Sequence, residues 1–398
     1  MTEYLAPGVY IEEVPFKSHP IEGVPTSTAA FIDIFEQGPI GKAVKIDCFA
    51  DFERVFGGLY RRSEASYAIR QYYLNGGRVA WVVRVDKLRA EKLIGDPAAQ
   101  TGMYALEGIA PDIFNILCIP AAANLDQKGF ASVISAADKY CCDKRAFLII
   151  DPPSAIKTKD EMVYWMQTND RLRHRNAAIY FPRLEIPDPL NGNQPRNVGA
   201  SGTLAGVYAR TDQTSGVWKA SAGAQADLRG ANMPVQLASR ENDELNKLGI
   251  NALRTFPQIG NVAWGARTLA GSDQDASEWK YVPVRRLALY LEESLYRGSK
   301  WAVFEPNDDL LWAEIRSSFG AFMTGLFRQG AFQGTKPGDA FFIRCDETTT
   351  TQDDIDSGVF NIIVGFAPLK PAEFILIRIQ QLAGQTNNPR NAETTRNK

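Results

Sequence analysis

The architecture of this chain is set by its middle, where residues 113–181 read IFNILCIPAAANLDQKGFASVISAADKYCCDKRAFLIIDPPSAIKTKDEMVYWMQTNDRLRHRNAAIYF. Three apolar runs of strand length alternate with two longer stretches whose apolar residues recur at helical spacing. The apolar runs are residues 113–119, 147–150 and 177–181, and the helical stretches are residues 127–142 and 159–173. Because this alternation is typical of a parallel sheet covered by helices, the sequence predicts an α/β domain.

The amino-terminal side extends the same pattern. Residues 27–34 and 79–85 are rich in β-formers and predict two further strands. Between them, Ser63 is placed to cap a helix that runs to Asn75, before a Gly-Gly stop signal. Residues 186–232, in contrast, are rich in Gly, Asn, Ala, Ser and Pro over a length far beyond an ordinary connection. We therefore expect an extended excursion there, shaped by partner molecules.

A second block of regular structure follows. Residues 284–295 and 311–326 each place apolar side chains on one stripe of a helix, and Asn307 or Asp308 caps the second. Residues 340–345 and 359–366 predict strands. The carboxy-terminal part should therefore form a smaller unit in which helices and strands are mixed.

Length and composition narrow the class of protein. With 398 residues, 44 Lys and Arg, 46 Asp and Glu, and a net charge of −2, the chain predicts two or more domains and favours neither nucleic acid nor an anionic membrane as a partner. No stretch approaches the about 18 apolar residues of a membrane helix, and the amino terminus lacks a signal-peptide pattern. We expect a protein made and kept in the cytosol, without direct membrane insertion.

Cofactor chemistry finds little support in the sequence. The five cysteines form no metal spacing, and their odd number argues against a disulfide framework, so reduced buried thiols are expected. The two histidines, His19 and His174, sit beside no cluster of metal-binding residues, and no phosphate-binding loop occurs. No metal, cofactor or nucleotide is predicted.

Both ends of the chain carry strand-forming segments. Near the start these are Val9, Tyr10, Ile11 and Glu12, and near the end Phe374, Ile375, Leu376, Ile377 and Ile379. An exposed strand with unpaired N–H and C=O groups needs a partner, and the last segment is apolar on both faces. Two readings stay open: addition of these strands to a neighbouring subunit, or an ordinary sheet within the chain that joins its two ends.

Catalysis by a serine-protease triad is the enzymatic alternative. Asp151, His174 and Ser201 occur in the order of subtilisin-like proteases. However, Ser201 lies in Gly199-Ala200-Ser201-Gly202-Thr203 and not in a Gly-Thr-Ser motif. We therefore expect a turn at Asp151, a helix-end role for His174 and no catalytic residue.

Many ordered segments give the sequence its family resemblance. They include Leu5-Ala6-Pro7-Gly8-Val9-Tyr10-Ile11-Glu12-Glu13, Asp51-Phe52-Glu53-Arg54-Val55-Phe56-Gly57-Gly58, Gly216-Val217-Trp218-Lys219-Ala220, Trp264-Gly265-Ala266-Arg267-Thr268-Leu269, Val284-Arg285-Arg286-Leu287, Phe304-Glu305-Pro306-Asn307 and Pro371-Ala372-Glu373-Phe374. With them the chain resembles the tail sheath proteins of contractile phages, R-type pyocins and extracellular contractile injection particles. It departs from the family at Ser221-Ala222-Gly223, where Pro-Ala-Asn is more usual, so only the loop geometry there is in doubt.

The resemblance implies a fold and a division of the chain. It implies an outer three-layer α/β domain, called subtilisin-like, and an inner α+β carboxy-terminal sheath domain, with extended strand arms at both termini. The expected parts are an arm at residues 1–20, the outer domain at 21–275, the inner domain at 276–371, and an arm and tail at 372–398.

The resemblance also implies partners. Copies stack as six-fold rings in a helical array around an inner tube protein, laced by their arms, and meet baseplate and tail terminator proteins. The protein would be cytoplasmic on assembly and then part of a phage tail or of a released or anchored injection particle. The residues expected to face the tube are Glu292, Glu293, Arg297, Arg316, Arg328 and Lys336. A solvated helix face is the other reading of these charges, and a non-contractile cap or baseplate adaptor is the other reading of the whole chain.

Overall fold

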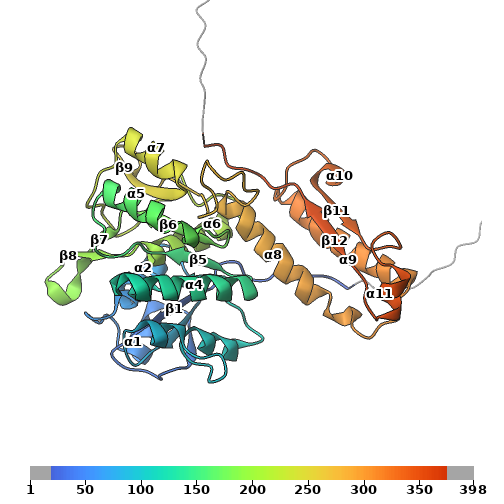
Figure 1. Cartoon of the computed structure of the whole chain (residues 1–398), viewed down its shortest axis with the longest axis horizontal. Helices are drawn as coiled ribbons and strands as arrows, with labels where there is room; N and C mark the ends of the chain where they lie inside the picture. The colour runs from blue at the N-terminus through green and yellow to red at the C-terminus, as the bar shows by residue number, and fades with distance from the viewer. Residues whose placement is uncertain (1–18, 374–398) are drawn as a thin grey trace, which may run out of the picture.

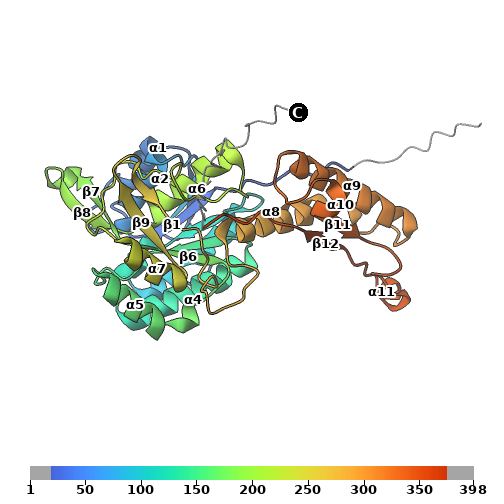
Figure 2. The ribbon, with the colours of Figure 1, turned by 90° about the horizontal axis from the view of Figure 1, so that it is seen from above.

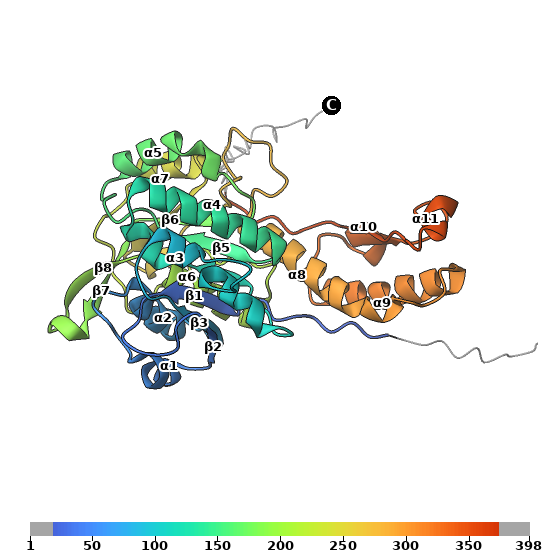
Figure 3. The ribbon, with the colours of Figure 1, turned by 60° about the horizontal axis from the view of Figure 1, so that its bottom comes forward.

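The computed structural model describes residues 19–373, so the predicted arm residues Val9 to Glu12 and Phe374 to Ile379 lie outside the described part. Figure 1 shows two bodies side by side: a larger one that contains the main sheet, and a narrower one that contains α9, α10 and α11. The helix α8 (Val282–Gly298) runs from one body to the other. Seen in Figure 3, the narrow body projects from the large one as an elongated extension.

The large body is built on an eight-stranded sheet in the order β10-β9-β6-β5-β4-β1-β3-β2. Its strands are parallel except for β2 and β10, which pair antiparallel to their neighbours at the two edges. The strands are β1 (Ala29–Asp33), β2 (Ala43–Ile46), β3 (Ala80–Arg84), β4 (Ile116–Cys118), β5 (Phe147–Ile150), β6 (Ala177–Phe181), β9 (Ile250–Phe256) and β10 (Gly260–Ala263). The parallel α/β sheet predicted from the middle of the sequence is confirmed.

Helices cover both faces of this sheet and make three layers (Figure 3). On one face α1 (Phe49–Phe56), α2 (Glu64–Leu74) and α6 (Ser201–Ser215) share a core with strand residues such as Phe31 and Phe147. On the other face α3 (Ala90–Ile94), α4 (Gln127–Asp143), α5 (Lys159–Thr168) and α7 (Ser239–Lys247) share a core with Ile32 and Leu148. Neighbouring strand residues point to opposite faces, so each apolar run supplies both cores.

Several local predictions hold at the level of single residues. Ser63 caps α2, because its side chain accepts a hydrogen bond from the backbone N–H of Ser66 at 3.1 Å. Asp308 caps α9 (Asp309–Arg328) by the same geometry toward Leu311 at 3.0 Å. The expectation of buried thiols is right for Cys118, Cys141 and Cys345 and wrong for Cys48 and Cys142, which are exposed.

The expected excursion at residues 186–232 is wrong. A hairpin of β7 (Leu184–Asp188) and β8 (Gln194–Val198) occupies its start, and the buried helix α6 follows. The first nine residues of α6, from Ser201 to Ala209, are all buried. The sequence did not predict this helix because its two faces differ little in hydrophobicity. Its small and polar residues resemble those of a loop. The same small residues allow α6 to pack closely against α2.

The narrow body packs around α8 and α9. Its strands β11 (Phe341–Arg344) and β12 (Ile363–Phe366) form a two-stranded antiparallel sheet, accompanied by the short helices α10 (Pro337–Ala340) and α11 (Gln352–Asp356). Leu287, Leu291 and Leu295 of α8 belong to its cores, while Val282 and Leu289 belong to the core of the large body. The helix α8 therefore packs against both bodies, and the domain boundary at residue 276 stays a prediction.

Candidate functional site

The carboxyl ends of parallel strands are where open α/β sheets hold ligands, and a polar cluster lies there. Asp151 follows β5 and accepts a hydrogen bond from the backbone N–H of Ser201 at 2.8 Å, while its second oxygen binds the Ser201 hydroxyl. His174 instead binds Asp138 of α4 at 2.9 Å. The three residues of the considered triad are therefore not assembled, and Asp151 and Ser201 are 5% and 0% exposed.

A buried ion pair beside Asp151 has a structural role. Glu64 pairs with Arg183, and the same carboxylate accepts hydrogen bonds from the Gly199 N–H at 2.7 Å and from the Asn124 amide at 2.6 Å. Arg183 also donates to Asn197 of β8 at 2.8 Å. These bonds fix the hairpin β7–β8 to the end of the sheet, and they occupy the oxygens that a substrate would need.

The burial of Asp151 predicts a pH-dependent stability. Removal from water raises the pKa of Asp151 from 3.8 to about 6, against the opposing effect of Arg183. Between these two values the folded state binds the proton more tightly than the unfolded state, so the unfolding free energy falls as pH rises. We expect a loss of at most about 3 kcal/mol from pH 4 to pH 7, measured by urea unfolding. In Asp151→Asn, whose amide can donate to Ser201, this part of the slope should disappear; an unchanged slope would contradict the assignment.

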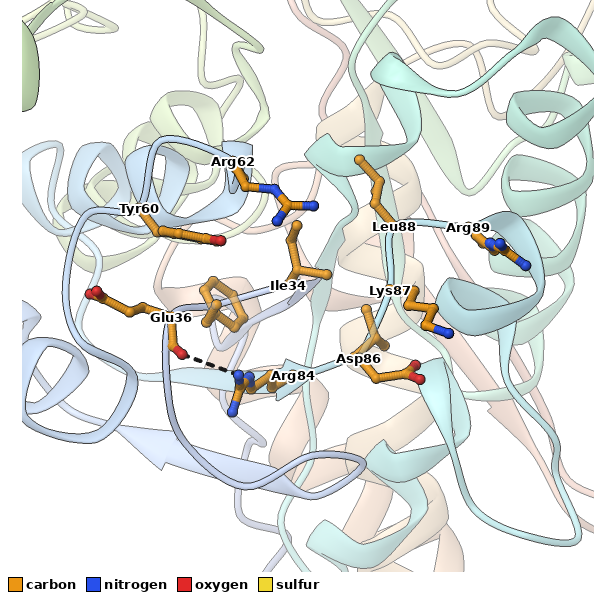
Figure 4. Close-up of a pocket in the computed structure, with 11 residues that line it drawn as sticks. Ile34, Glu36, Tyr60, Arg62, Arg84, Asp86, Lys87, Leu88 and Arg89 are labelled. Atoms are coloured by element: carbon orange, nitrogen blue, oxygen red, sulfur yellow. Dashed lines mark hydrogen bonds between the residues drawn. The ribbon is translucent and has the colours of Figure 1, made fainter.

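A cavity of about 350 Å³ opens beside the ends of β1 and β3. Figure 4 shows that charged side chains surround it, among them Glu36, Arg62, Arg84 and Asp86. Arg84 is engaged by the backbone carbonyls of Gly38 at 2.7 Å and Glu36 at 3.1 Å. The lining includes Tyr60 and Lys87, but neither side chain is bonded to Glu36 or Asp86, and Asp86 pairs with Lys92 instead, so no activated nucleophile is assembled in this cavity.

Residues 19–373 lack the features of two other classes of site. Within this part of the chain, no group of three or more His, Cys, Asp or Glu side chains is placed to hold a metal ion. Nor does any helix described there have the length and apolar character needed to cross a membrane.

The small sheet of the narrow body has features of an assembly surface. Ile343 and Val364 face its core, whereas Phe342 and Ile363 on the other face are 49% and 48% exposed. Among the described residues, β11 and β12 form a ladder only with each other, and an isolated bridge between Phe332 and Pro368 lies just beyond the end of β12. Most of the outer edge of each strand therefore has no strand partner in this part of the chain. The inner face of this sheet packs on α9, and because a free strand edge accepts further strands, the sheet is suited to strand addition at its edges.

The first described residues, 19–26, form an extended segment that lies along α8 and is called the strap below. His19 stacks on Trp301 with ring centroids 3.8 Å apart, and the backbone N–H of Val24 donates to Ser294 of α8 at 3.2 Å. The fit is close, because a Cβ atom at Gly23 would lie 2.0 Å from the Tyr290 hydroxyl. Figure 2 shows this start of the chain running beside α8 toward α9.

The two described ends of the chain lie at opposite ends of α8. His19 sits beside Trp301, which follows the carboxyl end of the helix, and Glu373 bonds to Tyr281, which precedes its amino end. The 17 residues of α8 separate them by roughly 25 Å. The described part of the chain therefore begins and ends at opposite ends of this helix.

The residues expected to face a tube have varied surroundings. Glu293 is 9% exposed and binds Arg145 of the large body at 2.8 Å and Arg297 at 2.6 Å. Glu292 binds Arg285 at 3.0 Å, and Arg316 donates to the Cys345 carbonyl. Arg328 and Lys336 are exposed. Contacts within one subunit do not test contact with a tube, so the tube-facing set stays a prediction.

Sequence reasoning missed the buried arginines that join the parts of the subunit. Arg267 and Arg286 are 0% and 4% exposed, and both bind carboxylates far away in the sequence. Arg267 lies among small and apolar residues in Ala266-Arg267-Thr268-Leu269, and the pair Arg285-Arg286 lies between Val284 and the apolar run Leu287-Ala288-Leu289. A charge in such a run is a usable signal for a buried ion pair.

Comparisons with known proteins agree on one family. A model of the phage tail sheath C-terminal domain matches residues 274–381. The tail sheath protein of Vibrio phage KVP40 is 30% identical over 184 residues, which are 46% of this chain and 26% of that protein. The chain thus matches this curated relative over about a quarter of the relative's length.

Solved structures match over nearly the whole chain. The sheath complex of PVC, an extracellular contractile injection system, in the contracted state has a TM-score of 0.76 and 28% identity, covering 96% of this chain and 99% of that one. The helical sheath of the anti-feeding prophage in the contracted state has a TM-score of 0.74 and 30% identity, covering 95% of this chain and 100% of that one. With the fold and the sequence matched over the full length of a sheath subunit, the chain belongs to the contractile tail sheath family.

Proposed function

We propose that this protein is the repeating subunit of the contractile sheath that surrounds the inner tube of a phage-tail-like injection machine. The observation that carries the proposal is the small sheet β11–β12, which combines free edges with an exposed apolar face. The departure of the chain ends from opposite ends of α8 supports it further, because each end is then placed to reach a different neighbour.

The terminal arms would lace the subunits by strand addition. Val9, Tyr10, Ile11 and Glu12 of one arm, and Phe374 to Ile379 of the other, have the pattern that an open sheet edge accepts. An arm that forms about five ladder hydrogen bonds gains roughly 1 kcal/mol net from each, in addition to apolar burial. Such arms would hold stacked six-fold rings together while the bodies of the subunits change their packing.

Contraction would draw on the energy of the lattice. The sheath assembles in an extended, metastable packing, and a trigger at the baseplate releases each ring into a wider packing of lower free energy. This mechanism requires neither nucleotide nor catalysis, in keeping with the binding of His174 to Asp138 and not to the bonded pair of Asp151 and Ser201. We therefore propose a structural role without enzymatic activity.

The remaining partners follow from the same proposal. The inner tube, the baseplate and a tail terminator would contact the sheath, which is cytoplasmic on assembly and later part of the particle. Of the proposed tube-facing residues, Glu292, Arg328 and Lys336 have the exposed side chains that a sliding, electrostatic contact needs, and Glu292 is already bound to Arg285. We expect Arg328→Glu to weaken the assembly of sheaths on tubes. If the variant forms sheaths on tubes as readily as the natural protein, Arg328 is not part of the contact.

Negative-stain microscopy of the purified protein tests the function. We expect long hollow tubes with a regular axial repeat, because contacts between copies of the subunit are sufficient to form the sheath lattice. A non-contractile cap or baseplate adaptor would instead form small oligomers of uniform size, and that outcome would contradict the sheath role.

A further inference from the structure

Among the buried arginines in the described part of the chain, Arg267 forms the largest number of polar contacts. Its Nε and one Nη donate to the two carboxylate oxygens of Glu373 at 2.8 and 2.7 Å. Its other Nη donates to Asp273 at 2.8 Å and to the Asn246 carbonyl at 2.8 Å. A two-bond contact between guanidinium and carboxylate fixes both position and orientation.

The arginine is itself held by the main sheet. The Asn251 side chain of β9 accepts a hydrogen bond from the Arg267 N–H at 2.7 Å and donates one to the Arg267 carbonyl, also at 2.7 Å. Asn251 and Arg267 are both 0% exposed. The backbone of Arg267 is thus held by the sheet of the large body, and its guanidinium is held there by Asp273 and the Asn246 carbonyl.

Glu373 reaches this arginine from the narrow body. Its chain leaves β12 at Phe366 and passes along a cavity of about 860 Å³, whose opposite wall includes Trp218 and Trp264. Residues 369–373 line the near side of this cavity, and Glu373 is the last described residue before the carboxy-terminal extension. The bonds to Arg267 and Tyr281 therefore tie the last described residue of the chain directly to the large body.

We propose that Arg267 is the anchor of the carboxy-terminal arm: through Glu373 it fixes the root of the arm to the sheet of the large body. The consequence, which rests on the proposed sheath function, is mechanical. The arm leaves in a direction set by the large body, so a rotation of that body in the lattice carries the arm with it. Arg267 is a positioning residue, because it acts on the neighbour only through the arm.

Proteolysis of the isolated full-length protein tests the anchor. Glu373→Gln removes the charge on the arm side, and Asp273→Asn is the matched control, since it removes a carboxylate from the same guanidinium without touching the arm. The rate of proteinase K cleavage within residues 367–373 is mapped by mass spectrometry. We expect about a tenfold or greater increase in Glu373→Gln and a change of less than about twofold in Asp273→Asn. Equal rates in the two variants would overturn the anchor.

A second variant and a second readout separate the anchor from the sheath role. Arg267→Lys keeps the charge but cannot form the two-bond contact, so it should also raise the cleavage rate while leaving cleavage of β4–β6 unchanged. If Arg267→Lys is cleaved no faster than the natural protein, the anchor is again wrong. Tube formation by the natural protein decides the sheath role independently, because the cleavage rates are measured before assembly.

Discussion

Gly202→Ala should lower the unfolding free energy by about 3 kcal/mol, the upper part of the range for overpacked sites. A Cβ atom at this position of α6 would lie 2.2 Å from the carbonyl oxygen of Ala68 in α2, and backbone atoms cannot move aside as a flexible side chain can. The two helices would have to separate, although alanine itself favours a helix by up to about 1 kcal/mol. Urea unfolding followed by circular dichroism measures the effect.

Gly325→Ala is the matched control for this prediction. Gly325 lies in the helix α9, and a Cβ atom there meets nothing within 4 Å. The substitution should leave stability unchanged or raise it by up to about 1 kcal/mol. Similar losses in both variants would show that helix content, and not the approach of α6 to α2, determines the cost.

Asp212→Asn should cost about 3–5 kcal/mol, because it leaves a buried guanidinium without its counter-charge. Arg286 of α8 donates to the two oxygens of Asp212 in α6 at 2.9 and 2.6 Å, and the two side chains are 4% and 3% exposed. The same arginine donates to the Thr26 carbonyl at 2.9 Å. The pair therefore joins the strap, α6 and α8, and its loss should also loosen the narrow body from the large one.

Glu292→Gln provides the contrast on the same helix. Glu292 accepts a single bond from Arg285 at 3.0 Å, and its side chain is 44% exposed. Although Arg285 is itself buried, it keeps its bond to Asn176 at 2.6 Å, so we expect a loss below about 1 kcal/mol. Thermal unfolding of both variants measures the difference. Equal shifts would show that burial does not control the strength of these contacts.

The fold was predictable where one periodicity dominated the sequence. The buried strands β5 and β6 are continuous apolar runs, and α2 and α9 have both a cap and an apolar stripe, so their residues alone define them. The helix α6 could not be found in this way, because its packing depends on small residues such as Gly202. Small residues signal close approach only when the opposite surface is known, and here that surface is α2.

The candidate site was predictable in part. Strand-forming termini indicated that the subunit needs partners. Nothing in the sequence, however, placed the first and last described residues, His19 and Glu373, at opposite ends of α8. The bond between Arg267 and Glu373 joins residues 106 positions apart, and such a pairing follows from the fold alone. Similarly, the order of Asp151, His174 and Ser201 suggested a triad, whereas the fold gives His174 to Asp138.

The lacing of subunits by their terminal arms is tested most directly by truncation and electron microscopy. Deletion of residues 1–15 or 374–398 should leave the melting temperature of the subunit nearly unchanged but abolish tube formation. Deletion of residues 385–398, which removes only the polar tail beyond the predicted strand, should leave tube formation intact. Regular tubes formed without either arm would contradict the account.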